Sequence, residues 1–225
     1  RAWQVQLTAP LGRAADRPEL LLQPWDLLDV VPRVAALKQR ARADGIVIMP
    51  GNNLGYFGPE EARLRALDDG AADHFAGCQA GRFVLGIESD GAIKGCPSLQ
   101  TDAYVVGNVR VEGLAQLWKD DAIRRPSART LDDLWGFCAR CPFAAACRGG
   151  CTFTAHAIMG RPGNNPYCHF RARTLAAEGV RERLVAVERA PGRPFDNGRF
   201  ELVVEPIDAP DPGRDRSARE RLRIV

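Results

Sequence analysis

Seven cysteines are the residues of this chain whose type and spacing point most directly to chemistry. All of them lie between residues 78 and 168 of the 225-residue chain, and four fall within the fourteen residues 138–151. An odd number of cysteines cannot pair completely into disulfides within one chain. Because no basic stretch followed by an apolar core marks a secretory signal, we expect the cytoplasm, where clustered cysteines bind metal more often than they form bridges.

The spacing of the cysteines divides them into two groups and a final single residue. The first group, Cys78, Gly91 and Cys96, reads Cys-x12-Gly-x4-Cys. The second group reads Cys-x2-Cys-x5-Cys-x3-Cys and consists of Cys138, Cys141, Cys147 and Cys151. The last cysteine, Cys168, follows after sixteen residues. Thiolates are soft ligands that suit iron–sulfur clusters or zinc, and Gly149 and Gly150 would let the backbone approach a bulky inorganic core. Spacing alone leaves structural zinc and iron–sulfur clusters as equal alternatives.

The complete pattern resembles the SPASM domain, the auxiliary-cluster domain of a large subfamily of radical SAM enzymes. That family shows Cys, nine to fifteen residues, Gly, four residues, Cys, then the Cys-x2-Cys-x5-Cys-x3-Cys group and a final Cys, and every spacing here agrees with it. Shorter stretches are similar as well, at residues 77–81, 95–99, 107–109, 147–151 and 165–168. The resemblance covers about residues 70–170, and residues 1–65 resemble more weakly the last part of a radical SAM partial barrel.

The resemblance implies two [4Fe–4S] clusters. Carried over by position, auxiliary cluster I would be held by Cys78, Cys96 and Cys151, and auxiliary cluster II by Cys138, Cys141, Cys147 and Cys168. Some family members have an eighth cysteine shortly before the first, and this chain has none there. Auxiliary cluster I is therefore expected either to be capped by Asp73 or His74 or to keep an open iron that binds a peptide substrate directly.

The Cys-x3-Cys-x2-Cys motif that holds the SAM-cleaving cluster of such enzymes does not occur, and residues 1–77 contain no cysteine. We therefore expect the C-terminal portion of a maturase that modifies a ribosomally made peptide or protein, with S-adenosylmethionine bound only by the full-length parent. Electron relay and substrate binding, including a leader peptide, would be its roles, with flavodoxin or ferredoxin as reductant. Whether the chain is itself an enzyme stays open: the alternatives are a non-catalytic peptide-binding or electron-transfer partner and a zinc-stapled interaction module.

The elements that must position these cysteines can be read from hydrophobic periodicity and turn residues. We predict a strand at 2–8, a helix at 24–43 and a strand at 46–49, followed by a glycine-rich loop at 51–58. A hairpin with strands at 85–88 and 93–95 turns at Asp90-Gly91. Further helices are predicted at 59–67, 113–118 and 166–187, and a late edge strand at 200–204. The expected class is α/β, with a partial (βα) barrel fragment followed by an irregular α+β SPASM domain. Domains are expected at 1–69, 70–187 and 188–225, the last partly disordered.

Composition excludes two classes of partner. The formal net charge is only +3 and the arginines are spread along the chain, so a nucleic-acid-binding face is not expected. No run of eighteen apolar residues suggests a membrane span. Four arginines in the predicted helix 166–187 are expected to form a solvated helix face or a surface for an acidic leader peptide: Arg171, Arg173, Arg181 and Arg183.

Overall fold

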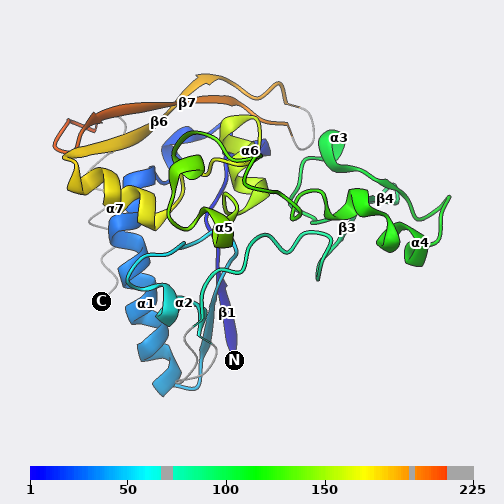
Figure 1. Ribbon diagram of the computed structural model, residues 1–225, viewed down its shortest axis with the longest axis horizontal. Coiled ribbons are helices and arrows are strands. Elements are labelled where there is room, and N and C mark those ends of the chain that lie inside the picture. Colours follow the sequence, from blue (N-terminus) through cyan, green and yellow to red (C-terminus); the bar gives the residue numbers. More distant parts are fainter. Residues whose placement is uncertain (67–72, 193–195, 212–225) are drawn as a thin grey trace.

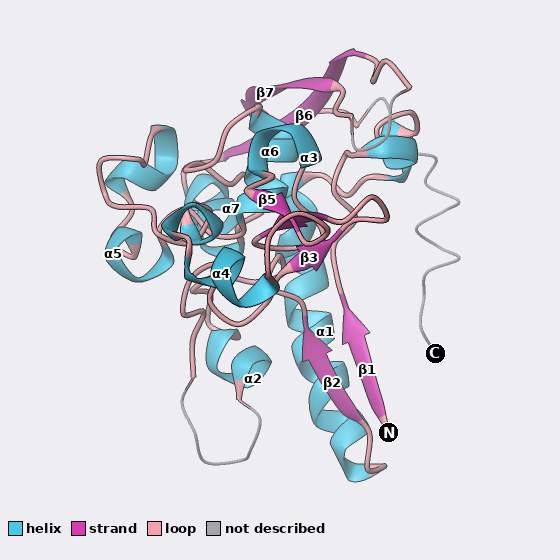
Figure 2. Cartoon of the chain, turned by 90° about the vertical axis from the view of Figure 1, so that its right-hand side faces the viewer, coloured by secondary structure: helices cyan, strands magenta, loops and turns pink. Residues whose placement is uncertain are grey.

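The computed structural model describes residues 1–66, 73–192 and 196–211. Its N-terminal part is a strand–helix–strand unit, in which β1 (Ala2–Val5) and β2 (Val47–Pro50) pair in parallel and α1 (Leu27–Ala43) connects them (Figure 1). This arrangement confirms the predicted βαβ order. Figure 2 shows the two strands side by side against α1, with the N-terminus at the free end of β1.

The helix of this unit buries one face. Leu27, Val31 and Ala35 follow each other at helical spacing, all are buried, and all belong to the largest hydrophobic core. The preceding turn begins with Pro24, whose fixed φ suits a first helical position. Pro32 lies inside α1, and the structure contains one continuous helix there.

The middle of the chain forms a small antiparallel sheet in the order β3 (Gly86–Ile87), β4 (Ala92–Lys94), β5 (Gly107–Asn108). The predicted hairpin is confirmed: Asp90 Oδ1 accepts a hydrogen bond from the backbone N–H of Ala92 at 3.0 Å, and Gly91 has φ +90°. Strand β5 was not predicted because a strand of two residues is too short to show an alternation of polar and apolar side chains.

Short helices and turns make up most of the remaining chain, and two of the cysteines, Cys138 and Cys147, lie within them. Most of these elements span one or two turns, as expected for an irregular domain: α2 Glu61–Arg65, α3 Thr101–Tyr104, α4 Leu114–Lys119, a 3₁₀ turn Gly136–Arg140, α5 Ala144–Cys147, α6 Thr152–Met159 and α7 His169–Ala177. None of the described helices is both long enough and apolar enough to cross a membrane.

The C-terminal part corrects the prediction of a helix over 166–187. Helix α7 ends at Ala177, and β6 (Val180–Glu188) pairs antiparallel with β7 (Arg199–Pro206) along the outer side of α6 and α7 (Figure 1). The physical reason is Gly179, whose φ of +77° stops the helix in the left-handed region. The predicted edge strand is confirmed within β7. The boundary expected after residue 187 falls inside β6, and the one expected after residue 69 lies outside the described residues, as does the tail 212–225.

Two of the four arginines expected on a solvated helix face are buried, which corrects that expectation. Arg171 forms an ion pair with Glu182 at 2.5 Å, and Arg181 lies 4.0 Å from the ring centroid of Trp25. Arg181 and Arg183 both lie on β6 and pair with one strand neighbour, Glu205, at 2.8 Å. Because these charges hold the C-terminal hairpin in place, they do not form a free surface for an acidic peptide.

Candidate metal centre

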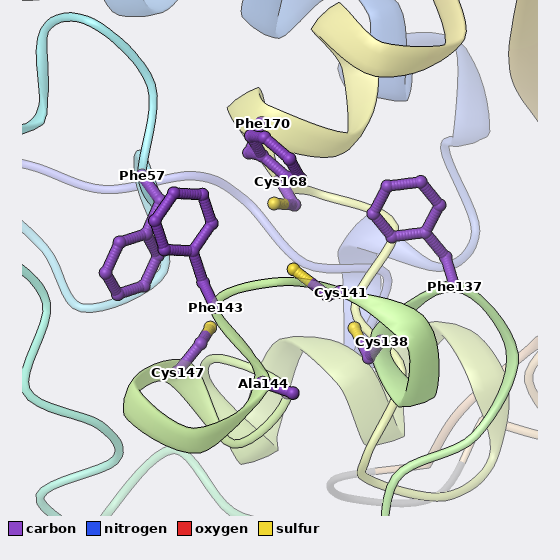
Figure 3. A pocket seen from close by; sticks show the side chains of 10 residues that line it. Phe57, Phe137, Cys138, Cys141, Phe143, Ala144, Cys147, Cys168 and Phe170 are labelled. Carbon is purple, nitrogen blue, oxygen red and sulfur yellow. The ribbon is translucent and has the colours of Figure 1, made fainter.

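Four of the cysteines line one hollow (Figure 3). Cys138 lies in the 3₁₀ turn, Cys141 directly follows it, Cys147 ends α5, and Cys168 precedes α7 as its N-cap. A short piece of chain between residues 138 and 168 therefore brings all four thiols to one space, although no single helix or strand carries them.

The wall of this hollow is aromatic. Four phenylalanines line it together with the thiols: Phe57, Phe137, Phe143 and Phe170. Phe143 stacks on Phe57 with ring centroids 4.5 Å apart and meets Phe170 edge-on at 4.9 Å. An apolar shell of this kind excludes water and lowers the local dielectric around a metal group, which influences its reduction potential.

Burial is the main cause of the raised pKa values of the thiols in the hollow. It raises the pKa of Cys147 to about 12 and raises the pKa of Cys168 further, and the nearby Cys138 adds to both increases. Without a metal these thiols hold their protons at neutral pH. A coordinated metal displaces the proton outright, so metal binding here releases protons.

The other three cysteines form a second group. Cys78 and Cys96 pack with Phe153 against a small core that contains Tyr104. Burial is the first cause that raises the pKa of Cys151 to about 11, and the charges of Cys78 and Cys96 raise it as well. Cys151 also packs against the core that contains Cys147, so it lies between the four-thiol hollow and the pair Cys78 and Cys96.

The cation Lys94 lies beside this three-thiol group. Its side chain is fully buried, forms an ion pair with Glu88 and donates to the carbonyl oxygen of Leu99 at 2.5 Å. Its charge lowers the pKa of Cys96, although burial is the larger effect and leaves that pKa raised. The site thus has a positive charge built in next to a thiol.

One loop, residues 147–151, supplies a thiol to each group. Arg129 is buried and holds this loop by donating to the carbonyl oxygens of Arg148 at 2.8 Å and Gly150 at 2.7 Å. A Cβ atom on Gly149 would lie 2.9 Å from the backbone of Gly163, so only glycine fits there. A Cβ atom on Gly150 would lie 3.0 Å from the side chain of Asn165. The approach of these two glycines to an inorganic core stays a prediction.

Tyr56 connects the two thiol groups from another direction. Its hydroxyl donates to the carbonyl oxygen of Asn52 at 2.5 Å and accepts the backbone N–H of Cys151 at 3.2 Å. Its ring packs in the same core as Cys147, and the charges of Cys151 and Cys147 both raise its pKa, after burial as the first cause. A single buried phenol thus contacts the segment that joins both groups.

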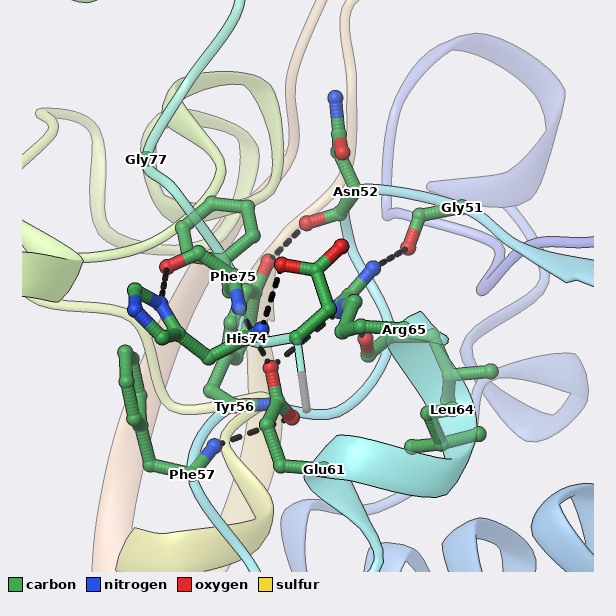
Figure 4. Close-up of polar contacts among 12 residues, drawn as sticks. Gly51, Asn52, Tyr56, Phe57, Glu61, Leu64, Arg65, His74, Phe75 and Gly77 are labelled. Carbon is green, nitrogen blue, oxygen red and sulfur yellow. Dashed lines mark hydrogen bonds and ion pairs between the residues drawn. The ribbon is translucent and has the colours of Figure 1, made fainter. Parts of the chain in front are cut away.

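Glu61 of α2 fastens the loop that carries Tyr56 (Figure 4). Its carboxylate accepts the backbone N–H groups of Tyr56 at 3.0 Å, Phe57 at 3.1 Å and Phe75 at 2.8 Å. Tyr56 and Phe57 have φ values of +79° and +54°, which is costly for side chains of this size. Two of these charge-assisted hydrogen bonds therefore hold the strained turn that sets Phe57 into the wall of the hollow, and the third ties the turn to Phe75.

The two residues expected to cap the three-thiol group lie elsewhere. The ring of His74 faces Phe57, with centroids 5.8 Å apart, and its Nδ1 lies 3.1 Å from the carbonyl oxygen of Phe75. Asp73 accepts the backbone N–H of His74 at 2.8 Å. Among the described residues neither side chain has a recorded contact with Cys78, Cys96 or Cys151, so the arrangement gives no support to capping.

The donor set fits a bulky thiolate-bound group. Over the residues that the structure describes, no three His, Cys, Asp or Glu side chains converge closely enough to hold a single metal ion. A zinc ion bound by four thiolates at about 2.3 Å would need their sulfurs within about 4 Å of one another. Four thiols around one hollow with an apolar wall are the donor type that iron–sulfur clusters use.

Sequence reasoning missed the residues that shape this site, namely the aromatic wall, Glu61, Tyr56 and Arg129. A signal existed for part of the wall, because Phe137, Phe143 and Phe170 each lie within two residues of a predicted ligand. Glu61 and Arg129 had no such signal. Their importance depends on backbone groups far away in the chain, which no local pattern reveals.

Comparison with known proteins agrees with this chemistry. Residues 78–142 match the family model SPASM, an iron–sulfur cluster-binding domain. The chain is similar to mycofactocin maturase MftC of Mycobacterium tuberculosis (strain CDC 1551 / Oshkosh), with 32% identity over 134 residues that cover 58% of this chain and 32% of the relative. The MftC of Mycobacterium ulcerans (strain Agy99) is 28% identical over 188 residues, which cover 82% of this chain and 45% of the relative.

A third relative, the mycofactocin maturase MftC of Mycolicibacterium smegmatis, is 34% identical over 165 residues, covering 71% of this chain and 38% of the relative. The chain thus spans between about a third and just under half of the length of the curated relatives it matches. Its cysteine pattern, its family match and these relatives agree with one another: the chain belongs to the radical SAM/SPASM peptide maturase family and carries that family's iron–sulfur cluster-binding domain.

Proposed function

We propose that the chain holds two [4Fe–4S] clusters and serves as the relay and substrate-binding part of an enzyme that modifies a ribosomally made peptide or protein. The four-thiol hollow holds auxiliary cluster II through Cys138, Cys141, Cys147 and Cys168. The three-thiol group holds auxiliary cluster I through Cys78, Cys96 and Cys151. When bound, such clusters take up and release single electrons at potentials set by net charge, hydrogen bonds and solvent access.

One observation carries this proposal: the seven thiols divide in space into a group of four and a group of three. Cys138, Cys141, Cys147 and Cys168 share one hollow, whereas Cys78 and Cys96 pack in a separate small core. The charges of Cys78 and Cys96 both raise the pKa of Cys151. This supports assigning the final cysteine of the Cys-x2-Cys-x5-Cys-x3-Cys motif to the distant pair, although Cys151 also packs against the core that contains Cys147.

The chain's own residues have distinct tasks in this proposal. The phenylalanine wall keeps water from the four-thiol hollow, while Arg129 and Tyr56 fix the loop that joins both groups. Lys94 offsets negative charge beside Cys96. The three-thiol group leaves one ligand position without a cysteine, and that position is available to a substrate or to a further ligand.

The wider activity extends beyond the residues of this chain. We propose that S-adenosylmethionine is cleaved by a further cluster in the full-length parent, with a flavodoxin or ferredoxin as reductant. The β1–α1–β2 unit would be the end of its partial barrel. Exposed apolar side chains on both strands support this placement, since Trp3 is 59% and Val47 49% exposed, as they would be where further strands or substrate belong.

The test is anaerobic reconstitution of the full chain, followed by iron, sulfide and zinc analysis and a visible spectrum. We expect about eight irons and eight sulfides per chain and a brown colour that fades on reduction. A colourless protein that retains one or two zinc ions after the same treatment would overturn the electron-relay role and favour a structural module.

A further inference from the structure

A second and larger hollow adjoins the three-thiol group. It has a volume of about 480 Å³, opens to solvent, and is formed by the end of α3, the segment 125–135, α6 and the turn at 161–162. This volume lies within the range of about 300–1,000 Å³ that is usual for ligand sites. Nothing in the cluster-binding role requires such a space.

The charge in this second hollow is mainly positive. Arg161 is exposed and lies 4.0 Å from the ring centroid of Trp135, without a hydrogen bond or ion pair to any residue that the structure describes. Arg125 is also exposed and donates to the carbonyl oxygen of Ala103 at 2.6 Å, again without a carboxylate partner among the described side chains. Two guanidinium groups thus retain donors that suit a carboxylate.

The other charged residues of this hollow are already engaged. Arg129 donates hydrogen bonds to backbone carbonyl oxygens and to the hydroxyl of Thr152. Asp133, the acid on the lining, accepts from the backbone N–H of Thr130 at 2.7 Å and from its hydroxyl at 3.1 Å. Neither residue neutralises Arg125 or Arg161, so the hollow presents a positive surface with an aromatic side.

The floor of the hollow leads to the thiols. Tyr104 lines the space, is 7% exposed, and packs in the same small core as Cys78 and Cys96. Its hydroxyl lies 2.7 Å from Nδ1 of His156, which fixes the ring. A ligand held by the two arginines would therefore be separated from the three-thiol group by little more than one aromatic ring.

We propose that this hollow binds a carboxylate of the peptide substrate, with Arg125 and Arg161 as the anion-binding groups and Trp135 as the surface against which the peptide packs. The inference rests on the proposed function, because it names where that substrate is held. A peptide offers two sources of carboxylate, an acidic side chain and the C-terminus, and both satisfy the same geometry.

The experiment is fluorescence anisotropy with the reconstituted full chain and three labelled peptides of equal length. The first carries Asp and Glu with an amidated C-terminus, the second carries neutral side chains with a free C-terminus, and the third is neutral and amidated. The test variant is Arg125→Ala/Arg161→Ala. Its control is Arg13→Ala/Arg33→Ala, which removes the same charge from exposed arginines outside the hollow.

We expect the first or the second peptide to bind and the neutral one to bind at least about tenfold more weakly, since a charged hydrogen bond contributes about one such factor. The test variant should lose this preference and the control should keep it, and whichever charged peptide binds identifies the source. The inference would be overturned if peptide affinity fell equally in both double variants, or if all three peptides bound equally or none bound. Tighter binding of inorganic phosphate than of any peptide would overturn it as well. Iron content measured on the same samples separates this outcome from failure of the cluster assignment.

Discussion

The two thiol groups differ in how they are assembled and in what surrounds them. The four-thiol hollow takes all its cysteines from residues 138–168 and is walled by phenylalanine. The three-thiol group combines residues 78, 96 and 151, and its neighbours are the cation Lys94 and the hydrogen-bonded pair of Tyr104 and His156.

This contrast indicates different physical constraints on the two groups. In the proposed assignment, four thiols beside an apolar wall would complete one cluster without a further ligand, as suits electron storage. The three other thiols would leave one position without a cysteine, and Tyr104 lies between them and the polar, arginine-bearing hollow, as suits a group that acts next to a bound substrate. Each of the following changes acts on one side of this comparison or on the loop that joins the two sides.

The largest effect is expected from removing thiols in pairs. Cys138→Ala/Cys141→Ala and Cys78→Ala/Cys96→Ala should each lose about four of about eight irons, because each pair belongs to a different cluster. Iron and sulfide analysis after reconstitution measures this. A pair whose removal leaves iron content unchanged would show that its group holds no cluster.

The loop that serves both groups should be the most sensitive backbone position. Gly149 and Gly160 both have positive φ, but a Cβ atom on Gly149 would lie 2.9 Å from the backbone of Gly163, whereas one on Gly160 meets nothing within 4 Å. Gly160→Ala should cost about 1–2 kcal/mol of unfolding free energy, and Gly149→Ala about 1–3 kcal/mol more.

Urea unfolding of both variants measures the difference, and Gly160→Ala is the matched control for the left-handed conformation. Gly149→Ala should also lower the iron content of both groups, since its loop carries a thiol of each. Equal stability of the two alanine variants would mean that the loop moves freely and does not fix the groups relative to each other.

The strained turn behind the phenylalanine wall can be tested at Glu61. Glu61→Gln removes a buried charge that accepts three backbone N–H groups and pairs with Arg65, so we expect a loss of about 2 kcal/mol. Asp29→Asn, in an exposed pair with Arg33 at the same helical spacing, should cost under about 1 kcal/mol. Thermal or urea unfolding distinguishes the two, and similar losses would contradict a special role for Glu61.

The smallest expected effect concerns access to the four-thiol hollow. In the Cys78→Ala/Cys96→Ala background, Phe143→Ala should speed the loss of visible absorbance in air, because it opens the wall to water and oxygen. Phe83→Ala, at a side chain that is 84% exposed, is the control. Identical decay in both variants would show that the wall does not shield the hollow.

Local patterns were sufficient for several elements. The turn at Asp90-Gly91 follows from residues that bond their own backbone, and the βαβ unit follows from apolar positions at periods of two and 3.6. The prediction failed at β6, where Gly179 ends α7 and the charged, alternating residues after it pair with β7. A helix and a strand share such a composition, and only the partner strand decides between them.

The sequence by itself determined the kind of ligands and the likeness to a cluster-binding family, because thiol spacing is a property of the chain. Tertiary structure alone decided that Glu61 holds the turn before Phe57, and that Arg125 and Arg161 border a hollow beside Tyr104. These relations join residues that are far apart in the chain. Their energies come from burial and from hydrogen bonds to distant backbone groups, which exist only once the chain has folded.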